Sequence, residues 1–292
     1  MRQHRLAFCA AHFPAWVVKQ TSRTIRSHRM FGHSERVLVA VSGGKDSLAL
    51  WDVLLELGYQ ADGLYIDLGI DAGDAYSATS RHKAAAFAAA RPDTRLIIVD
   101  IAACYGETLA EVARRKRDIQ RPCAICGLIK RHEMNRVTLE EGYPVLATGH
   151  NLDDEAATLL GNVLYWQSGY LRRQWPVLPA DETGLARKVK PFHRFYERET
   201  AAYALIRGID YIHAECPHAV GASSIAHKQT LNQMEHAKPG TKMQFYINFL
   251  RAKKEGLFVP FEDEQITLNT CAQCGQSTTA EARCTFCRLW EV

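Results

Sequence analysis

The sequence predicts an α/β protein with a doubly wound, mostly parallel sheet and a small cysteine-rich module near its C-terminal end. Short apolar runs alternate with helical patterns over the first half of the chain, as in a parallel sheet covered by helices on both faces. The first apolar run leads directly into the glycine turn SGGKDS, and four cysteines form two close pairs after residue 270. The 292 residues can bury one large core or two modest ones.

The apolar runs and helical patterns place the elements in order along the chain. Strands are predicted at 36–41, 61–68, 95–100 and 144–148. Helices are predicted at 14–30, 46–57 and 77–90, in a basic stretch that ends near residue 117, at 127–141 and from about residue 153. Residues 166–190 lose periodicity and contain two prolines, so we expect a surface loop there, followed by a mostly helical region at 197–254.

Composition excludes several classes of protein. No apolar run is long enough to span a membrane, and the N-terminus lacks the apolar region of a signal peptide, so we expect a cytoplasmic protein with no membrane partner. The formal net charge of +4 is only mildly basic and is weak evidence for a polyanionic partner. Thiols stay reduced in the cytoplasm, so most of the nine cysteines are expected to bind metal or to do chemistry.

The turn SGGKDS lies between a predicted strand and a predicted helix. Glycines let the backbone approach an anion, and the helix N-terminus offers free N–H groups. The spacing fits neither the Walker A loop nor the dinucleotide fingerprint, and a plain strand–helix turn is the structural alternative. The turn resembles the PP-loop of the N-type ATP pyrophosphatases. That resemblance implies that this turn holds the phosphates of ATP, with Mg²⁺, through Ser42, Gly43, Gly44, Lys45, Asp46 and Ser47.

A second motif, RPCAICGLIKRH, places Cys123 and Cys126 before the predicted helix at 127–141. The spacing suits a redox dithiol, a zinc site with two further ligands, or an iron–sulfur cluster that recruits Cys216 from the distant fragment ECPHA. Thioredoxin-like surroundings are missing, and the spacing alone does not choose between the two metals. Three thiolates on a four-iron cluster would leave one iron able to hold an exogenous sulfide.

The stretch ATGHNLDDEAATLLGN follows the predicted strand at 144–148. Its acidic residues are favourable in a first helical turn, which is the structural interpretation. The functional interpretation is that one of them faces a nucleotide at the carboxyl end of the sheet, where doubly wound folds bind ligands.

Together, SGGKDS, CAICGLIKR, GHNLDDEA and ECP resemble the TtcA/TtuA family of tRNA 2-thiolation enzymes over nearly the whole chain. The resemblance implies a [4Fe-4S] cluster on Cys123, Cys126 and Cys216, and catalytic roles for Lys130 and Asp154. It implies that ATP adenylates the C2 oxygen of a uracil in tRNA and that sulfur then displaces AMP. The C-terminal cysteines favour the TtuA branch, which implies the T-loop uridine as target, a ubiquitin-like sulfur carrier with a C-terminal thiocarboxylate, and a homodimer.

The two ends of the chain carry different cysteine patterns. The pairs Cys271/Cys274 and Cys284/Cys287 make a set of four thiolates that suits structural Zn²⁺. At the N-terminus, only Cys9 and His12 match the Cys/His finger of the family, and two ligands do not make a structural zinc site. We therefore expect either that this finger is lost or that its first pair is encoded upstream of Met1.

Three basic runs are interpreted as contacts to tRNA phosphates rather than as solvated faces alone. They comprise Arg23, Arg26, His28 and Arg29; Arg114, Arg115, Lys116, Arg117 and Arg121; and Arg172, Arg173, Arg187, Lys188 and Lys190.

The sequence therefore divides into a partial finger with a basic helix at 1–33, a PP-loop domain at 34–255 and a zinc ribbon at 256–292. Three rivals to a T-loop thiolase stay open. They are a wobble-uridine thiolase, a non-catalytic iron–sulfur tRNA-binding protein, and an ATP-dependent amidotransferase, which would leave the three cluster cysteines without a purpose.

Overall fold

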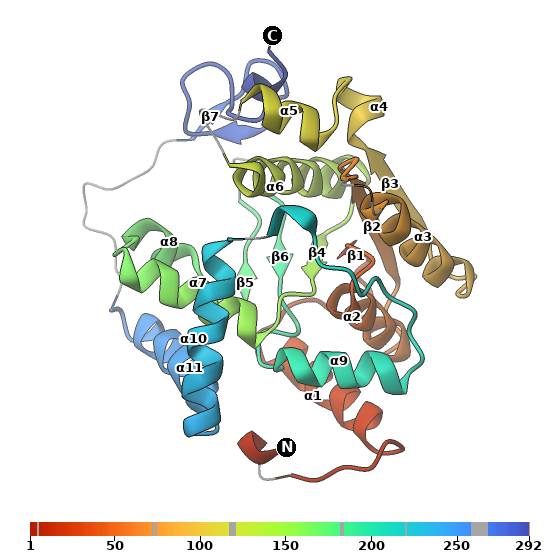
Figure 1. Cartoon of the computed structure of the whole chain (residues 1–292), viewed down its shortest axis with the longest axis vertical. Coiled ribbons are helices and arrows are strands. Elements are labelled where there is room, and N and C mark those ends of the chain that lie inside the picture. The colour runs from red at the N-terminus through yellow and green to blue at the C-terminus, as the bar shows by residue number, and fades with distance from the viewer. Residues whose placement is uncertain are drawn as a thin grey trace.

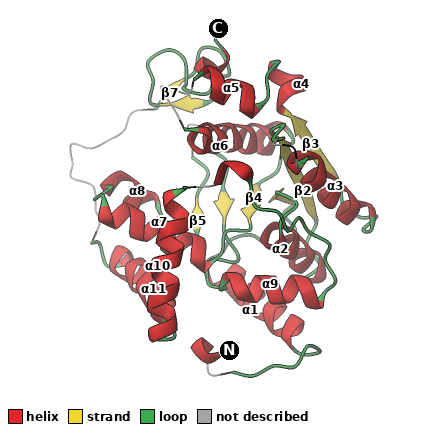
Figure 2. Cartoon of the chain, viewed as in Figure 1, coloured by secondary structure: helices red, strands yellow, loops and turns green. Residues whose placement is uncertain are grey.

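A computed structural model describes residues 1–4, 6–71, 73, 75–116, 121–181, 184–219, 221–257 and 268–291 of the chain. Helices dominate, and they surround one central sheet (Figure 2). No helix among these residues combines the length and apolar character that a membrane crossing needs.

The central sheet has six strands in the order β3-β2-β1-β4-β6-β5. Neighbouring strands run parallel, except that β5 is antiparallel to β6. The chain builds β2 and β3 on one side of β1 and then crosses to place β4 on the other side, which confirms the doubly wound, mostly parallel sheet. The strands are β1 (Val37–Val41), β2 (Ala61–Asp67), β3 (Leu96–Asp100), β4 (Val145–Thr148), β5 (Val177–Leu178) and β6 (Lys188–Val189).

Both faces of the sheet are buried, which explains why the inner strands read as continuous apolar runs. In β1, Val37, Val39 and Val41 pack into one core cluster, and Leu38 packs into the other. The first face is covered by α1 (Phe13–Ser27), α2 (Lys45–Glu56), α3 (Tyr76–Ala89) and α9 (Glu197–Ile206). The second face is covered by α4 (Ile101–Tyr105), α5 (Leu109–Arg115) and α6 (Pro122–Glu140). Figure 1 shows α6 and α5 on the opposite side of the strands from α1 and α9.

A helical group lies beside the sheet, at the left in Figure 1. It is joined to the rest by α7, which packs against both α10 and α11. Its members are α7 (Leu152–Leu164), α8 (Ser168–Arg173), α10 (Ser223–Ala237) and α11 (Thr241–Lys254). Buried side chains such as Leu159, Leu231 and Tyr246 form its core.

The C-terminal cysteine module is docked on the second face of the sheet. It contains the strands β7 (Asn269–Thr270) and β8 (Ser277–Thr278), and its aromatic side chains pack against α4 and α6. The Phe286 ring stacks on His132 with 3.5 Å between ring centroids, and Trp290 stacks on Tyr105 at 4.6 Å. Arg115 of α5 donates a hydrogen bond of 2.9 Å to the Leu289 carbonyl. The module therefore shares its core with the rest of the protein.

Two sequence predictions need correction. Helix α6 begins at Pro122, five residues before the predicted start, because proline suits the first turn of a helix and Arg121 provides the extended residue before it. Cys123 and Cys126 therefore lie in the helix and not ahead of it. The predicted surface loop at 166–190 contains α8 and the two short strands β5 and β6, which extend the sheet beyond β4. Strands of two residues are too short to show periodicity.

A buried carboxylate holds α2 against α9. The Asp52 side chain is 4% exposed and accepts hydrogen bonds from Arg91 at 2.6 Å, from the Tyr203 hydroxyl at 2.8 Å and from Arg207 at 3.0 Å. Tyr203 and Arg207 come from α9 and the residue after it, so this cluster fixes the position of the helix that begins at Glu197.

We predict that Asp52→Ala lowers the free energy of unfolding by about 2–4 kcal/mol, because it leaves the buried Tyr203 hydroxyl without an acceptor and separates two arginines from their carboxylate. Asp52→Asn keeps an acceptor of the same shape and is expected to cost less. Urea denaturation followed by tryptophan fluorescence measures both values. An alanine variant within about 0.5 kcal/mol of the parent, the range of ordinary surface substitutions, would contradict this role.

Candidate active site

The candidate site lies where β1 and β4 end side by side. Neighbouring strands whose connections leave in opposite directions open a crevice at their carboxyl ends. Here a cavity of about 310 Å³ opens between the turn after β1, the turn after β4 and helix α6. Its polar lining comes from Ser42, Asp46, Ser47, Ser77, Ser80, Lys130, Thr148, His150 and Asp154, and its apolar lining includes Leu64, Ile66, Leu68 and Ile70. A cavity lined by both polar and apolar groups suits a ligand that joins an anion to a flat ring.

The conformation of the turn after β1 requires glycine at position 43. Gly43 has φ = 71°, and a Cβ atom there would lie 2.3 Å from the Ser80 carbonyl oxygen. Within the turn, the Ser42 N–H donates to Ser47 Oγ at 3.0 Å, and Ser47 Oγ donates to the Gly44 carbonyl at 3.0 Å. These bonds close the loop tightly around the start of α2.

The N-terminus of α2 carries no side-chain cap, because its cap residue is Gly44. Its first N–H groups therefore have no side-chain acceptor from the cap residue, and a helix start of this kind, with its dipole, is a favourable place for an anion. Gly149, after β4, brings the neighbouring turn close, since a Cβ atom there would lie 2.9 Å from the Asp46 carbonyl oxygen. The two turns thus form adjoining walls of one site.

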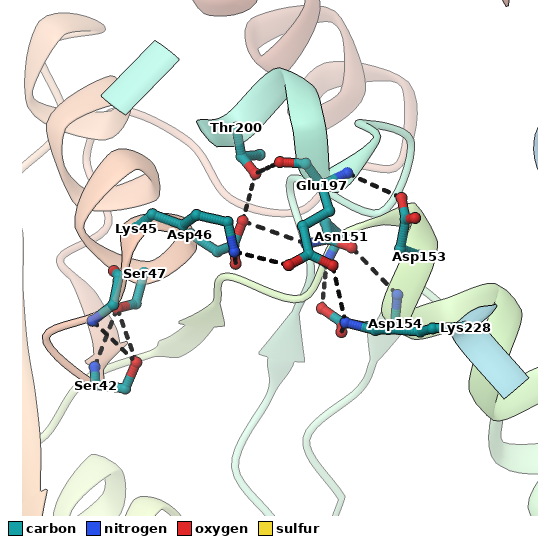
Figure 3. Close-up of polar contacts among 11 residues, drawn as sticks. Ser42, Lys45, Asp46, Ser47, Asn151, Asp153, Asp154, Glu197, Thr200 and Lys228 are labelled. Carbon is teal, nitrogen blue, oxygen red and sulfur yellow. Dashed lines mark hydrogen bonds and ion pairs between the residues drawn. The ribbon is translucent and has the colours of Figure 1, made fainter. Parts of the chain in front are cut away.

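Lys45 and Asp46 are held by partners from three elements (Figure 3). The Lys45 ammonium lies 3.1 Å from Asp46 Oδ2 and 2.8 Å from Glu197 Oε1. Asp46 Oδ1 accepts hydrogen bonds from Thr200 and, at 3.3 Å, from Asn151. Burial alone would lower the pKa of Lys45, but Asp46 and Glu197 raise it, so the lysine stays cationic.

Asp154 has two sets of contacts. Its Oδ2 atom accepts the Asn151 N–H at 3.1 Å in a capping box of α7, which confirms the structural interpretation of the acidic helix start. Its Oδ1 atom lies 2.6 Å from the ammonium of Lys228 on α10, and Lys228 also lies 3.1 Å from Glu197 Oε2. Because Asp154 also lines the cavity, the capping role and a role at the ligand are compatible.

Lys130 reaches the cavity from α6. The positions of Cys123, Cys126 and Lys130 follow the three- and four-residue spacing of one helix face. Burial, Cys126 and Cys216 raise the pKa of the Cys123 thiol above its usual value, and the nearby charge of Lys130 partly opposes them. One helix therefore presents a lysine to the cavity and two thiols next to it.

The third thiol, Cys216, comes directly before the 3₁₀ turn Pro217–Ala219 that follows α9. The Cys123 thiol donates a hydrogen bond of 3.1 Å to the carbonyl of His218, two residues after Cys216. Burial, Cys216 and Cys126 all raise the pKa of Tyr76, a tyrosine that lines the cavity. The structure thus brings the three thiols together beside the cavity, although their sulfur atoms do not form the compact group, within 4.8 Å, that a single ion requires. A four-iron cluster is larger than an ion and holds its cysteines farther apart.

The four C-terminal cysteines do form such a compact group. The ligand atoms of Cys271, Cys274, Cys284 and Cys287 all lie within 4.8 Å of one another. The Cys284 N–H donates to Cys271 Sγ at 3.2 Å, and burial, which raises the pKa of Cys271, is outweighed by backbone N–H groups that lower it to about 6. Four converging thiols with N–H donors fit a closed tetrahedral metal site.

Cys9 and His12 form a pair in the exposed turn before α1, with 3.0 Å between Cys9 Sγ and His12 Nδ1. Within the described part of the chain, the C-terminal quartet is the only group of three or more ligands with atoms that close together. His4 lies 2.8 Å from Glu199 and is not available to them. The Cys9–His12 pair therefore has too few ligands for a structural metal site in these residues.

The basic runs only partly fit the interpretation as tRNA contacts. Arg115 binds Glu107 and the C-terminal module, Arg187 binds Glu35, and Lys190 binds Glu155 at 2.7 Å, so these three side chains have internal partners. The runs on α1 and α5 also belong to helices that cover opposite faces of the sheet. Arg117 lies outside the described residues.

Sequence reasoning missed several side chains of the site. They are Tyr76, Asn151, Glu197, Thr200 and Lys228. Asn151 was recognisable as a cap before an acidic turn, because the order Asn-Leu-Asp-Asp fits a capping box. Glu197 and Lys228 gave no signal, since each is an isolated charge on a helix far along the chain.

The chain is similar to characterised proteins over its whole length. It is 51% identical over 291 residues to the tRNA-5-methyluridine(54) 2-sulfurtransferase of Thermus thermophilus, covering 100% of this chain and 87% of that protein. It is 40% identical to the protein of the same name from Thermotoga maritima, covering 99% and 91%. No family model matches the chain.

A solved structure shares the fold. The U34-tRNA thiolase NcsA from Methanococcus maripaludis, solved with its [4Fe-4S] cluster, superposes with a TM-score of 0.79 at 22% identity and covers 99% of this chain and 90% of its own. This agreement supports the fold described above.

The geometry of the glycine turn leads to a paired prediction. Gly43→Ala should lower the free energy of unfolding by about 2 kcal/mol or more, because its Cβ would meet the Ser80 backbone and its φ is positive. Gly44→Ala, one residue on, has φ = −88° and only a hydroxyl 3.3 Å away, and should cost about 1 kcal/mol or less. Chemical denaturation of both variants gives the comparison, and equal losses would show that the turn is not constrained in this way.

Proposed function

The chain belongs to the TtcA/TtuA family of tRNA 2-thiolation enzymes, and we propose that it thiolates the T-loop 5-methyluridine of tRNA through the cavity between β1, β4 and α6. The observation that carries the proposal is 51% identity, over the whole chain, to a tRNA-5-methyluridine(54) 2-sulfurtransferase. The geometry agrees with it, because an anion-binding helix start, Lys130 and Asp154 line one cavity.

In the first step, the C2 oxygen of the uracil attacks the α-phosphorus of ATP. A bond forms between that oxygen and phosphorus, the bond to the β-phosphate bridging oxygen breaks, and pyrophosphate leaves. Charge accumulates on the phosphate oxygens, where the α2 N-terminus and Lys45 are positioned to stabilise it. Lys130 is assigned to the activated base, and Asp154 to a magnesium ion or to the uracil N3 proton.

In the second step, a sulfur nucleophile attacks C2 and AMP leaves with the original oxygen. Cys123, Cys126 and Cys216 would hold a [4Fe-4S] cluster, and three thiols meeting beside the cavity fit that group. When bound, such a cluster supplies one iron without a protein ligand, which can hold sulfide. Tyr76 and Lys130, on the side of the cavity toward the thiols, would orient the base between ATP and the sulfur.

Two further ions complete the proposal. Mg²⁺ accompanies ATP, and the carboxylates of Asp46 and Asp154 at the cavity supply the oxygen ligands that it prefers. Zn²⁺ would fill the C-terminal quartet, where four thiols converge. Because the quartet's module stacks on α6 through Phe286 and His132, zinc would stabilise the helix that carries Lys130.

The tRNA would contact the surface at the α7–α8 corner as well as the cavity. Tyr165, Trp166 and Tyr170 are 70%, 76% and 59% exposed there, and Arg173 lies over the Tyr170 ring at 5.3 Å. Trp166 has φ = 46°, a costly conformation for a residue with a large side chain. Exposed aromatic rings beside an arginine suit unpaired RNA bases, which stack on such side chains.

Other partners follow from the family. We propose a ubiquitin-like carrier with a C-terminal thiocarboxylate as sulfur donor, a homodimer as the working state, and the cytoplasm as the site of action. The wobble-uridine thiolase is the nearest rival and shares the fold, as the superposition on NcsA shows. The chain is 51% identical to a T-loop enzyme but only 22% identical to NcsA, and this difference supports position 54 as the target.

We predict that the anaerobically purified chain releases pyrophosphate from ATP only with tRNA, and that the tRNA gains 2-thiouridine at the T-loop once sulfide is added. Lys130→Met and Asp154→Asn should each slow pyrophosphate release by about 10²-fold or more, because each removes a group from the reacting end of the cavity. Lys19→Met, which changes an exposed side chain of α1, is the control and should react like the parent.

Nucleoside mass spectrometry of fragments from the product tRNA identifies the modified position. Sulfur at the wobble position would favour the rival thiolase. Tight tRNA binding without any pyrophosphate release would favour a non-catalytic binder.

The two cysteine sets are predicted to hold different metals. Cys216→Ser, purified anaerobically, should lose most of its iron and keep its zinc, because it removes one ligand of the proposed cluster. Cys284→Ser should lose zinc and keep iron, with lower stability. Plasma emission spectrometry of both proteins measures the metals. Loss of iron from Cys284→Ser, with none lost from Cys216→Ser, would assign the cluster to the quartet instead.

A further inference from the structure

Two lysines from distant parts of the chain share one carboxylate at the edge of the cavity. Glu197 Oε1 lies 2.8 Å from Lys45 Nζ, and Glu197 Oε2 lies 3.1 Å from Lys228 Nζ (Figure 3). Lys45 begins α2 and Lys228 lies on α10, so the glutamate at the start of α9 bridges two ammonium groups from separate helices.

Both ammonium groups stand next to cavity-lining carboxylates without lining the cavity themselves. Lys45 contacts Asp46 at 3.1 Å and Lys228 contacts Asp154 at 2.6 Å, and those two aspartates line the cavity. A nucleotide in the cavity whose phosphates lie beside these aspartates would have both lysines within reach.

The Lys228 pair is not needed to attach α10 to α7. Lys242 of α11 joins these two helices instead, because it binds both Asp153 of α7 and, at 2.7 Å, Asn232 of α10, and the side chains of Lys242 and Asp153 are only 5% and 7% exposed. Leu231 of α10 also makes an apolar contact with Ala156 and Ala157 of α7. By contrast, the side chains of Lys228 and Asp154 are 27% and 29% exposed, so they remain accessible to a ligand.

We propose that Lys45 and Lys228 form a subsite for the β- and γ-phosphates of ATP, and hence for the leaving pyrophosphate, which Glu197 occupies when no nucleotide is bound. This inference rests on the ATP-dependent reaction proposed above. A carboxylate that bridges two ammonium groups uses the donors that a phosphate would use. The backbone of Glu197 is fixed, since its N–H donates to Asp153 at 2.9 Å, so only its side chain has to move.

The subsite would act on the adenylation step. As the bond between the α-phosphorus and its bridging oxygen breaks, negative charge grows on the departing pyrophosphate. Two ammonium groups at that end stabilise this charge, and neither of them contacts the AMP that stays behind. The proposed subsite would therefore separate the groups that bind pyrophosphate from the groups that bind AMP.

Binding of ATP, of pyrophosphate and of AMP to the anaerobically purified full chain, measured separately by calorimetry, tests the subsite. Lys228→Gln should weaken ATP and pyrophosphate binding about tenfold or more, the effect of losing one charge-assisted hydrogen bond, and should leave AMP binding within twofold. Lys228→Arg should restore most of the affinity for pyrophosphate. Lys238→Gln, at the exposed end of the same helix, is the matched control and should match the parent for all three ligands.

Glu197→Gln is expected to change the affinity for pyrophosphate in the opposite direction to Lys228→Gln. Without added Mg²⁺, this variant should bind pyrophosphate several-fold more tightly than the parent, because no competing anion has to be displaced. Equal losses of AMP and pyrophosphate affinity in Lys228→Gln, or no loss of either, would overturn the subsite, as would weaker pyrophosphate binding in Glu197→Gln. A parent chain that binds none of the three ligands would instead reject the proposed function itself.

Discussion

The close approach of two turns is the constraint on which the rest of the site depends. The turn after β1 and the turn after β4 meet where the chain changes winding direction, and Gly149 leaves no room for a side chain at that contact. Gly43 likewise leaves no room where the first turn meets the Ser80 backbone of α3. The contact between the two turns directs the N-terminus of α2 into the crevice and places Asp46 within reach of Asn151. The glycine turn and the acidic turn, which are far apart in the sequence, therefore contact each other and form one site.

Helix α6 connects the remaining parts of the site. Its first turns carry Cys123 and Cys126, its third turn carries Lys130, and its middle carries His132, on which the C-terminal module stacks. The cysteine module packs on α6 at His132, and the same helix brings Lys130 to the cavity. The module therefore stabilises one wall of the cavity without contacting the cavity itself. The family relationship then gives these parts a common purpose, because a tRNA thiolase must bring ATP, a base and sulfur to one place.

Much of the fold and the centre of the site could be predicted from the sequence. The apolar strands and the SGGKDS turn predicted the parallel sheet and the tight turn between β1 and α2, because both are local patterns with a direct physical cause. The contribution of α9 and α10 could not be predicted. Glu197 and Lys228 are single charges. The packing of α9, fixed partly by Asp52, brings Glu197 to Lys45, and the packing of α10 against α7 brings Lys228 to Asp154. The predicted loop at 166–190 was wrong because two-residue strands leave no pattern to detect.

The central claim is that three thiols from α6 and the turn at Cys216 converge on the pocket that activates the base. The most direct measurement is an anaerobic crystal structure of the iron-reconstituted chain with a non-hydrolysable ATP analogue. We expect iron density on Cys123, Cys126 and Cys216, facing the α-phosphate across Lys130. Iron density at the C-terminal quartet, or a nucleotide bound away from the β1–β4 crevice, would contradict it.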